Sequence, residues 1–435
     1  MGNNRLKISF ILLILGFLVF NSQAQEPLRI TLEQALEIAL SESNTVKIAD
    51  MTIEKSGYAK KGSYASLYPN VNVTSSYQRT LLKQVMVMDM GGQPMEIKVG
   101  RDNNISASAS ASMPLINASL WESLKLSALD VELAVEQARS SRVSLVSQVK
   151  QAFYGVLLAK ESLAVMTQVY ENAQANYEKT EQRFTVGKAS ELEKLRAQVN
   201  VMNAEPNVSS AENAVLLATW QLKAVMGLDL QNDIDVVGDL KDYVNELLTP
   251  YVKEDDIENN SSLLQFGIQE KMLQSTLRMQ KKQYLPTLAA SINYNYSAMG
   301  DEELRWFPSS TAAVSLNIPI FDGFQKHFNI KQSKIGLDML ATQREDTERQ
   351  IRIAIRNYND KIALCVKNYL AANSTVEIAR KSYEISEKMY EVGKATLVEL
   401  NDAQLALQQA QLTQAQAVYN YMVAKAAMDE LIGKE

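Results

Sequence analysis

The sequence contains very little cysteine or histidine. Its 435 residues include one cysteine, Cys365, and one histidine, His327. A lone cysteine excludes an internal disulfide, and a lone histidine excludes a multi-histidine metal site, although carboxylates alone could still bind a hard cation. Only 9 prolines and 17 glycines interrupt the chain. We therefore expect few long elements rather than many short ones.

Long apolar runs are also scarce. Beyond the N-terminus no window reaches the roughly 18 uninterrupted apolar residues that predict a membrane-spanning helix. The N-terminal run, Ile8–Phe20, is too short to span and follows two cations, Arg5 and Lys7. Ser22-Gln23-Ala24 then fits a cleavage site, so residues 1–24 are typical of a signal peptide. We expect an exported protein beginning near Gln25, with no cysteine at that junction to carry a lipid anchor.

The negative charge is concentrated in one segment. Without the signal peptide, 42 lysines and arginines face 50 acids, which leaves a net charge of −8. The stretch Asp229–Glu258 has ten acids against Lys241 and Lys253, which is also −8. The remainder is balanced, and nothing resembles the basic surface that binds nucleic acid. We also find no Ser/His/Asp set, Cys/His set or phosphate loop, so we predict no enzyme, no catalytic residue and no cofactor.

Two stretches of the chain are nearly the same motif. Arg183–Gln198 and Met389–Gln404 share Val-Gly-Lys-Ala, and their glycines, Gly187 and Gly393, lie 206 residues apart. Each motif stands between two long helical patterns. The glycine suits the left-handed residue that ends a helix. A hydroxyl residue follows in each copy, and a glutamate lies six residues past each glycine. We therefore expect two tight turns, each at the tip of a helical hairpin.

The duplication extends over most of the chain. A helical pattern from Leu28 to Lys61, with Thr31 as the expected N-cap, has a counterpart in 256–282. We divide the chain into a signal peptide (1–24), a first repeat (25–227), an acidic connector (228–258) and a second repeat (259–435). Each repeat is expected to contain a helix, two strands and a long helical hairpin.

Strict alternation of apolar and polar residues predicts four strands. The clearest is Ile105–Met113, in which Ile105, three alanines and Met113 alternate with four serines. The others begin after Pro69, begin after Pro286, and end before Pro319. Each has roughly the nine to eleven residues that cross a bilayer as β-structure. The first strand pair is 12 residues longer than the second, and we assign the excess to its loop, 81–103.

Long heptad patterns predict coiled coils. From Ser119 to Phe184 there is no proline, and a helix of this length would span roughly 95 Å. Pro206 predicts a kink or a break in the first return helix, 188–226. In the second repeat, Cys365 falls on the seam and should be buried. Apolar residues recur every seven positions at Val149, Val156, Leu163, Tyr170, Tyr177 and Phe184, and again at Ile355, Ile362, Tyr369, Val376, Tyr383 and Tyr390.

Four strands with one apolar face each cannot pair all the backbone N–H and C=O groups at the edges of their sheet in lipid. Spanning β-structure must close on itself, and known closed barrels begin at about eight strands. One chain supplies four, so a barrel must be shared between copies. A dimer would give eight strands and a trimer twelve, and the pattern alone leaves both open. Helical hairpins attached to these strands would project from the membrane, which indicates a conduit.

At this point the sequence resembles the TolC-like outer-membrane efflux channel family. The resemblance rests on the signal peptide, the two repeats, the Tyr-Leu-Pro start of a strand and the paired Phe/Tyr-x-Val-Gly-x-Ala-Ser/Thr turns. It implies a mainly α protein with transmembrane β-structure: a homotrimer with a shared 12-stranded barrel in the outer membrane of a Gram-negative bacterium, continued by a periplasmic tunnel of coiled-coil hairpins. It also implies a passive exit duct of a tripartite efflux or type I export system. The implied partners are outer-membrane lipid, a periplasmic membrane-fusion adaptor and, through it, an inner-membrane pump of the RND or ABC type.

The resemblance also implies roles for residues at the tips. Six of them would dock the adaptor: Val186, Gly187, Lys188, Val392, Gly393 and Lys394. Four would form a periplasmic gate: Glu193, Tyr390, Glu399 and Asp402. Threefold symmetry would bring these acids together, and such rings favour cations. Ala395 departs from the family pattern, in which an arginine helps to keep the tunnel closed.

Three questions stay open at this point. A non-conducting structural or adhesive coiled-coil protein is the alternative function, although a stalk needs neither the alternating strands nor the duplicated tips. The cargo, whether drug, metal or protein, has no signature, and neither do the pump class and the resting state. Met86, Met88, Met90 and Met95 suggest soft-metal capture, but we expect them on a flexible loop surface and predict no metal site.

Overall fold

The computed structural model describes residues 28–89, 91, 94–250, 253 and 255–434. The predicted signal peptide and Met90 lie outside the described residues. The chain divides into two compact units. Unit 1 combines Met1–Ile48, Ser140–Asn260 and Ile351–Glu435, and unit 2 combines Ala49–Arg139 and Ser261–Gln350. Each unit therefore takes segments from both predicted repeats. Among the described helices, none is both long enough and apolar enough to cross a membrane.

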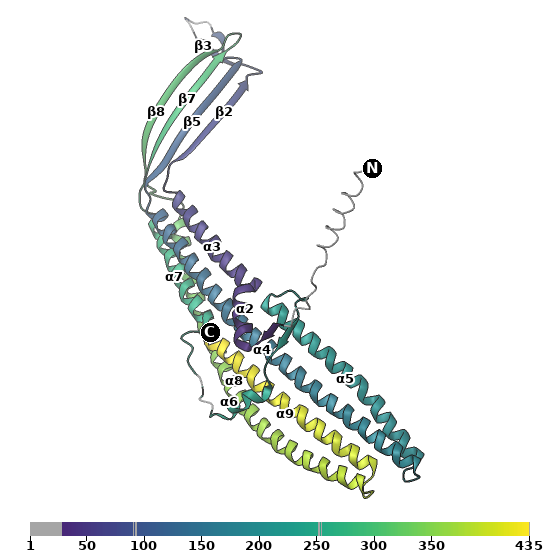
Figure 1. Ribbon diagram of the computed structural model, residues 1–435. Coiled ribbons are helices and arrows are strands. Elements are labelled where there is room, and N and C mark those ends of the chain that lie inside the picture. The colour runs from purple at the N-terminus through teal and green to yellow at the C-terminus, as the bar shows by residue number, and fades with distance from the viewer. Residues whose placement is uncertain (1–27, 90, 92–93, 251–252, 254, 435) are drawn as a thin grey trace, which may run out of the picture. The chain divides into compact units, whose positions relative to one another are not determined.

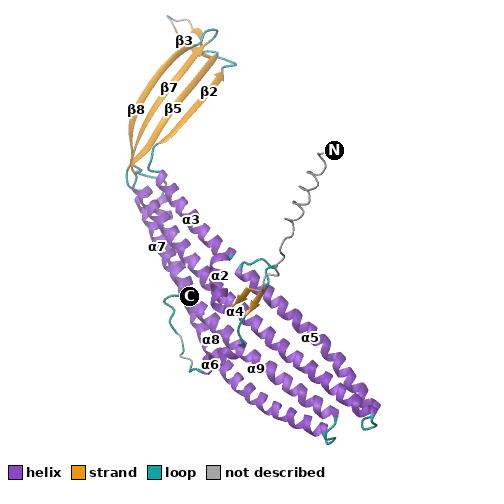
Figure 2. Cartoon of the chain, viewed as in Figure 1, coloured by secondary structure: helices purple, strands orange, loops and turns teal. Residues whose placement is uncertain are grey.

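A four-stranded antiparallel sheet dominates unit 2 (Figures 1 and 2). Its order is β2-β5-β7-β8, and the four predicted strands are confirmed. Pro69 and Pro286 directly precede β2 and β7, because proline suits the first position of a strand, where no ladder donor is needed. The strands are β2 (Asn70–Arg79), β5 (Asn103–Ile116), β7 (Thr287–Gly300) and β8 (Arg305–Asn317).

The register of the sheet separates an apolar face from a polar one. Val73 lies opposite Ala109, which lies opposite Tyr294 on the next strand. Thr74 lies opposite Ser108, which lies opposite Asn295. Because directly opposed residues share a face, the alternation gives an apolar and a polar surface across β2, β5 and β7. At β8 the separation is incomplete, since Ser310 lies opposite Tyr294 and Phe307 lies opposite Ser297. β2 and β8 each pair on one side only in the described part of the chain.

The expected flexible loop between β2 and β5 is wrong, because the segment forms a second β-hairpin. β3 (Gln84–Asp89) pairs with β4 (Pro94–Val99), and Met88 lies opposite Met95. The apolar run Val85–Met88, with its two β-branched valines, was the overlooked signal. The base of this hairpin is tied to the turn after β7: the Asp301 carboxylate accepts hydrogen bonds from Lys83 Nζ and Arg101 Nη1, each at 2.8 Å.

Helices complete unit 2 at one end of the sheet (Figure 1). α3 (Asn44–Ala65) and α7 (Ser261–Lys282) accompany the first turns of α4 (Ala118–Thr185) and α8 (Gln325–Glu391), both of which continue into unit 1. Asn117 caps α4, since its Oδ1 accepts the Leu120 N–H at 3.1 Å. His327 lies in the first turn of α8.

Unit 1 contains the two predicted hairpins. α4 returns as α5 (Glu191–Met226), and α8 returns as α9 (Leu397–Ile432). The seam predicted for α8 is buried from Ile355 to Tyr390, and so is Cys365. Of the kink or break predicted at Pro206, the break is wrong, because α5 continues through this residue as one helix.

The acidic connector folds against the hairpins of unit 1. β6 (Ile234–Val236) pairs in parallel with β1 (Leu28–Ile30), which sequence analysis missed. A 3₁₀ turn, η1 (Leu240–Tyr243), and the short helix α6 (Val244–Leu248) follow. Lys160 on α4 donates to the Asp235 carboxylate at 2.7 Å and to the Val236 carbonyl at 2.6 Å. α2 (Leu32–Glu42) begins with the predicted Thr31 capping box.

Candidate docking and gating tips

The two hairpin tips have the same backbone geometry. Gly187 and Gly393 have φ angles of 74° and 75°, in the left-handed region that glycine occupies without steric cost. Lys188 N–H donates to the Arg183 carbonyl at 2.7 Å, and Lys394 N–H donates to the Met389 carbonyl at 2.8 Å. Each glycine N–H also donates to the carbonyl three residues before it. These are the two bonds of a Schellman motif, so the predicted turns are confirmed.

The two candidate gate glutamates also cap helices. Glu193 accepts the Ser190 backbone N–H at 2.8 Å, and Glu399 accepts the Thr396 backbone N–H at 2.7 Å. Each hydroxyl accepts a hydrogen bond in return, which completes a capping box. The backbone and side-chain hydrogen bonds from Thr396 lower the pKa of the Glu399 carboxyl. Both glutamates therefore cap the N-termini of the return helices, α5 and α9.

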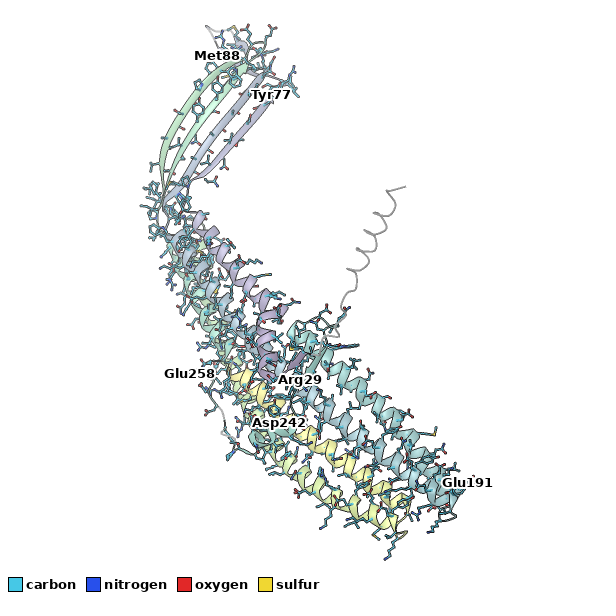
Figure 3. All side chains as sticks on the ribbon, in the orientation of Figure 1. Arg29, Tyr77, Met88, Glu191, Asp242 and Glu258 are labelled. Atoms are coloured by element: carbon cyan, nitrogen blue, oxygen red, sulfur yellow. The ribbon has the colours of Figure 1, made fainter. Side chains whose placement is uncertain are left out.

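The docking residues predicted at the tips are open to solvent. The side chains of Val186 and Val392 are 67% and 68% exposed, and Lys188 and Lys394 are exposed beside them. Figure 3 shows Glu191, the first residue of α5, at this end of the first hairpin. Each tip therefore presents one apolar and one cationic side chain on a rigid turn.

Tyr390 joins the two hairpins beneath their tips. It is buried, and its hydroxyl lies 2.7 Å from Thr180 Oγ1 on α4. Thr180 donates its only hydroxyl hydrogen to the Asn176 carbonyl, so Tyr390 must be the donor to Thr180. Arg183 lies over the Tyr390 ring, 5.2 Å from its centroid, and Nη1 donates to the Tyr390 carbonyl.

The tips are not equivalent in their surroundings. Phe184 occupies the position in the first tip that Tyr390 occupies in the second, yet its ring is partly exposed and lies beneath Lys194. Where the first hairpin has Lys194, the second has Leu400, which is fully buried in a cluster with Tyr383, Tyr390 and Leu397. The sequence repeat therefore conceals a difference between the tips: the aromatic residue is buried in the second and exposed in the first.

Further bonds hold α4 against the second hairpin. Lys179 pairs with Glu391 at 2.7 Å, and Gln404 Nε2 donates to the Val169 carbonyl at 3.1 Å. Asp402, the fourth gate candidate, is exposed and forms no ion pair with the described residues. Thr180 and Arg183 were missed by sequence analysis, because only the packing of α4 against α8 brings them to Tyr390. Within the described residues, no group of three or more His, Cys, Asp or Glu side chains could hold a metal ion.

An amphipathic antiparallel sheet, two coiled-coil hairpins and a duplicated rigid tip define the class of channel-forming outer-membrane proteins. The comparisons with known proteins agree. The family model for "Outer membrane efflux protein" matches residues 35–228 and 254–434, so the chain belongs to the outer membrane efflux protein family.

Relatives and solved structures support this assignment. The chain is 25% identical to the outer membrane protein TolC of Escherichia coli over 358 residues, which cover 76% of this chain and 70% of TolC. It is 21% identical to the cobalt-zinc-cadmium resistance protein CzcC of Cupriavidus metallidurans over 70% of this chain and 71% of CzcC. The fold matches the Campylobacter jejuni CmeC outer membrane channel with a TM-score of 0.71 and 17% identity, over 92% of this chain and 85% of CmeC.

Membership of the family establishes the general function. The protein is a channel of the outer membrane of Gram-negative bacteria, of the kind found in efflux and type I secretion systems, and it is not an enzyme. The resemblance inferred from the duplicated tips is thus confirmed, and the alternative of a non-conducting stalk does not agree with the family.

Proposed function

We propose that three copies of this chain form the exit duct of a tripartite efflux or export assembly. In this arrangement the three sheets close into one 12-stranded barrel and the hairpins form a periplasmic tunnel. A periplasmic adaptor binds at the tips and connects the duct to an inner-membrane pump. The duct itself is passive.

Unpartnered edges are the observation that carries this proposal. β2 and β8 each leave one row of backbone N–H and C=O groups without a partner in the described sheet. Such groups are costly in lipid, where no water can bind them. Pairing β8 of one copy with β2 of the next satisfies both rows. Three copies then give the 12-stranded barrel that the resemblance to TolC-like channels implies.

The hairpins carry a second pair of unused contact surfaces. α8 has its buried seam and also an exposed apolar row repeating every seven residues: Leu364, Ala371, Ile378 and Ile385. α5 has an exposed row at coiled-coil spacing: Leu192, Leu195, Val199 and Met202. Figure 1 draws these helices at the two outer edges of the hairpins in unit 1. A heptad row needs a partner helix, so we assign the α5 row of one copy to the α8 row of its neighbour.

The gate follows from the same symmetry. Around a threefold axis, Glu399 and Asp402 from each copy would form rings of carboxylates at the narrow end of the tunnel. Rings of acids favour cations over anions. Tyr390, held by Thr180 and Arg183, keeps the second tip in one position and so sets the width of this constriction.

Single-channel conductance of the purified trimer in a planar bilayer tests the proposal. We expect discrete, cation-selective openings that are small at rest. Glu399→Ala with Asp402→Ala should weaken block by multivalent cations from the tip side, and Tyr390→Phe should enlarge the resting conductance. Glu212→Ala, an exposed acid far along α5, is the matched control. Well-folded trimers that never conduct, even with Tyr390, Glu399 and Asp402 replaced, would contradict the proposal.

A further inference from the structure

The β3–β4 hairpin is unusually rich in methionine. Four of the 17 methionines of the chain lie between residues 86 and 95. Three of them fall on the two strands, with Met86 and Met88 on β3 and Met95 on β4. Figure 3 shows Met88 at the end of the sheet that lies away from the helices of unit 2. The proposed duct makes no use of these side chains.

The register of the hairpin places the three methionines on one face. Met88 lies directly opposite Met95, and Met86 lies two positions before Met88. Directly opposed residues share a face, and so do residues two apart on one strand. Opposed Cβ atoms are roughly 5 Å apart, which long side chains can bridge. No member of this surface, which we call the methionine face, carries a charge: Gln84, Met86, Met88, Met95, Ile97 and Val99.

The three thioethers of this face are open to solvent. Met86, Met88 and Met95 are 45%, 48% and 45% exposed. Methionine has three rotatable bonds and a polarisable sulfur atom. Three such side chains at neighbouring positions can therefore turn their sulfur atoms toward one ion that arrives from solution.

The other face of the hairpin shows that strand formation does not require methionine. There, Val85 lies opposite Lys98, and Val87 lies opposite Glu96. β-branched residues such as these valines suit a strand better than flexible unbranched ones. Valine or isoleucine at the three methionine positions would give an equally apolar surface. The sulfur atoms are therefore what distinguishes the methionine face.

Neutral sulfur ligands select the kind of ion. Thioethers prefer soft ions such as Cu⁺, whereas Mg²⁺ and Ca²⁺ prefer oxygen ligands. A divalent ion on this face would also keep its full charge without a compensating anion, which is costly, and a monovalent ion halves that charge. A thioether site needs no histidine, cysteine or carboxylate, and so it is compatible with the absence of such clusters among the described residues.

Asp301 holds the open end of the hairpin in register. Lys83 directly precedes β3 and Arg101 follows β4 by two positions, and the Asp301 carboxylate accepts a hydrogen bond from each at 2.8 Å. A slip by one residue would move Met86 and Met88 to the other face. The two contacts to Asp301 oppose such a slip, so the three methionines stay together.

We propose that Met86, Met88 and Met95 form a binding site for a soft monovalent cation, Cu⁺ or Ag⁺. The ion joins β3 to β4 through sulfur atoms from both strands. The site lies within one copy of the chain, so it does not depend on the proposed trimer or on the gate. It replaces our expectation of a loop without a metal site.

Titration calorimetry with silver nitrate in a chloride-free buffer tests the site. A Cys365→Ala background removes the one thiol of the chain, which would itself bind silver. We expect saturable binding of a single ion per chain, and no such binding of zinc. Met86→Leu with Met88→Leu and Met95→Leu keeps the surface apolar and removes the sulfur atoms, so this variant should lose the binding.

Methionines elsewhere in the chain provide the matched control. Met51 on α3, Met202 on α5 and Met339 on α8 are all more exposed than those of the methionine face. Their joint replacement by leucine should leave silver binding unchanged. Equal losses in the two triple variants would mean that silver binds any exposed thioether, and this result would overturn the site. Binding that survives in the methionine-face variant would overturn it too.

The pH dependence gives an independent readout. Thiol and imidazole ligands must lose a proton to bind a metal ion, whereas a thioether has no proton to lose. The affinity for silver should therefore be the same at about pH 5 and about pH 8. A steep loss of affinity at the acid end would assign the binding to other groups and overturn the proposal.

Hydrogen exchange shows whether the hairpin itself binds the ion. Silver should slow the exchange of amides in β3 and β4, because the ion joins these strands, and leave β2 and β8 unchanged. Without silver, the leucine variant should exchange like its parent. If the leucines open the hairpin, Met88→Leu alone decides, since it removes one sulfur atom and should also lose the binding. Unchanged exchange on addition of silver, or no saturable binding, would leave the hairpin as an apolar surface and overturn the metal site.

Discussion

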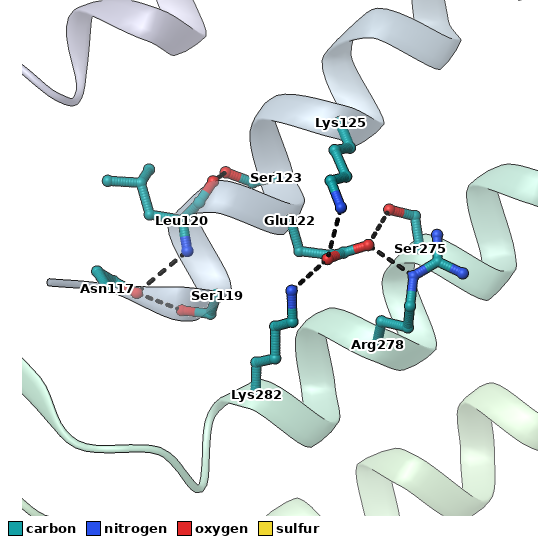
Figure 4. A network of polar contacts seen from close by, with 9 residues as sticks. All are labelled: Asn117, Ser119, Leu120, Glu122, Ser123, Lys125, Ser275, Arg278 and Lys282. Atoms are coloured by element: carbon teal, nitrogen blue, oxygen red, sulfur yellow. Dashed lines mark hydrogen bonds and ion pairs between the residues drawn. The ribbon is translucent and has the colours of Figure 1, made fainter.

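The carboxylate of Glu122 sits among groups of opposite charge on the neighbouring helix. Its side chain is fully buried, and it accepts hydrogen bonds from Arg278 Nε and Lys282 Nζ, each at 2.6 Å, and from Ser275 Oγ at 3.1 Å (Figure 4). Burial alone would raise the pKa of Glu122, but the bonds from Lys282, Arg278 and Ser275 outweigh it and lower the pKa to about 2. The network joins α4 to α7 within unit 2.

Glu122→Gln should destabilise unit 2 at neutral pH. Removing one partner of a buried ion pair leaves uncompensated charge, and we expect a loss of roughly 3 kcal/mol, the lower end of the usual range because Arg278 and Lys282 keep some contact with water. A depressed pKa contributes stability above the ordinary value of 4.5, and this contribution is lost as the pH falls towards about 2. Thermal melts of wild type and variant from neutral pH down to that range measure both effects.

Glu270 provides the matched control on α7, the helix that carries Arg278 and Lys282. It pairs with Arg344 at 3.7 Å, and both side chains are about half exposed. Exposed pairs contribute little, so Glu270→Gln should change the stability by less than about 1 kcal/mol. An equal loss for the two variants would mean that the buried network has no special role.

At the scale of elements, the tips depend on two glycines. A β-branched residue at Gly187 or Gly393 must adopt φ near 75°, which costs roughly 1–2 kcal/mol at each position. We expect Gly187→Val with Gly393→Val to abolish export while trimers persist, because the exposed tip residues lose the geometry that the proposed adaptor would bind. Drug-susceptibility assays and native electrophoresis measure the two properties.

Gly155→Ala is the control for this pair. Gly155 lies inside α4, has no positive φ, and has open space where a Cβ would stand. It should therefore tolerate alanine without loss of export. Normal export by the double valine variant would remove the docking role from the tips.

The Asp301 carboxylate ties the base of the β3–β4 hairpin to the turn after β7. The Asp301 carboxylate accepts hydrogen bonds from Lys83, Arg101 and the backbone N–H of Asp102. These bonds, of which the one from Lys83 has the largest effect, lower the pKa of Asp301 well below its usual range. Asp301→Asn should speed hydrogen exchange of the amides in β3 and β4 and leave those of β5 and β7 unchanged. Glu302→Gln, at the next position, should change neither pair of strands. Unchanged exchange in β3 and β4 would show that the hairpin is stable without this anchor.

At the scale of the whole molecule, the proposed assembly depends on the exposed row of α5. Leu195→Glu with Met202→Glu places charges in the middle of this row, where the neighbouring α8 would bury them. Burying an unpaired charge is costly, so the variant should remain monomeric in detergent while its helical content is unchanged. Light scattering after size exclusion measures the mass. Gln198→Glu, an exposed position outside the row, is the control and should form trimers; trimers of the double variant would refute the α5–α8 contact.

Local patterns in the sequence were sufficient for most of the elements. The Schellman turns at Gly187 and Gly393 and the capping boxes at Ser190 and Thr396 involve residues within six positions of one another. Alternation predicted the four strands, and the heptads predicted the buried seam of α8, because both periods follow from backbone geometry alone. The family followed from the same motifs, since their duplication in one register is specific.

Contacts between distant segments were decided only by the tertiary structure. Glu122 meets Lys282 across 160 positions, and Thr180 meets Tyr390 across 210. No period in the sequence links such residues, and the sequence alone treats Phe184 and Tyr390 as equivalent. Their different burial arises from which helices pack beside them. The physical reason is that hydrogen bonding and periodicity act along a few turns of chain, whereas the partner of a buried polar group depends on how whole helices are packed together.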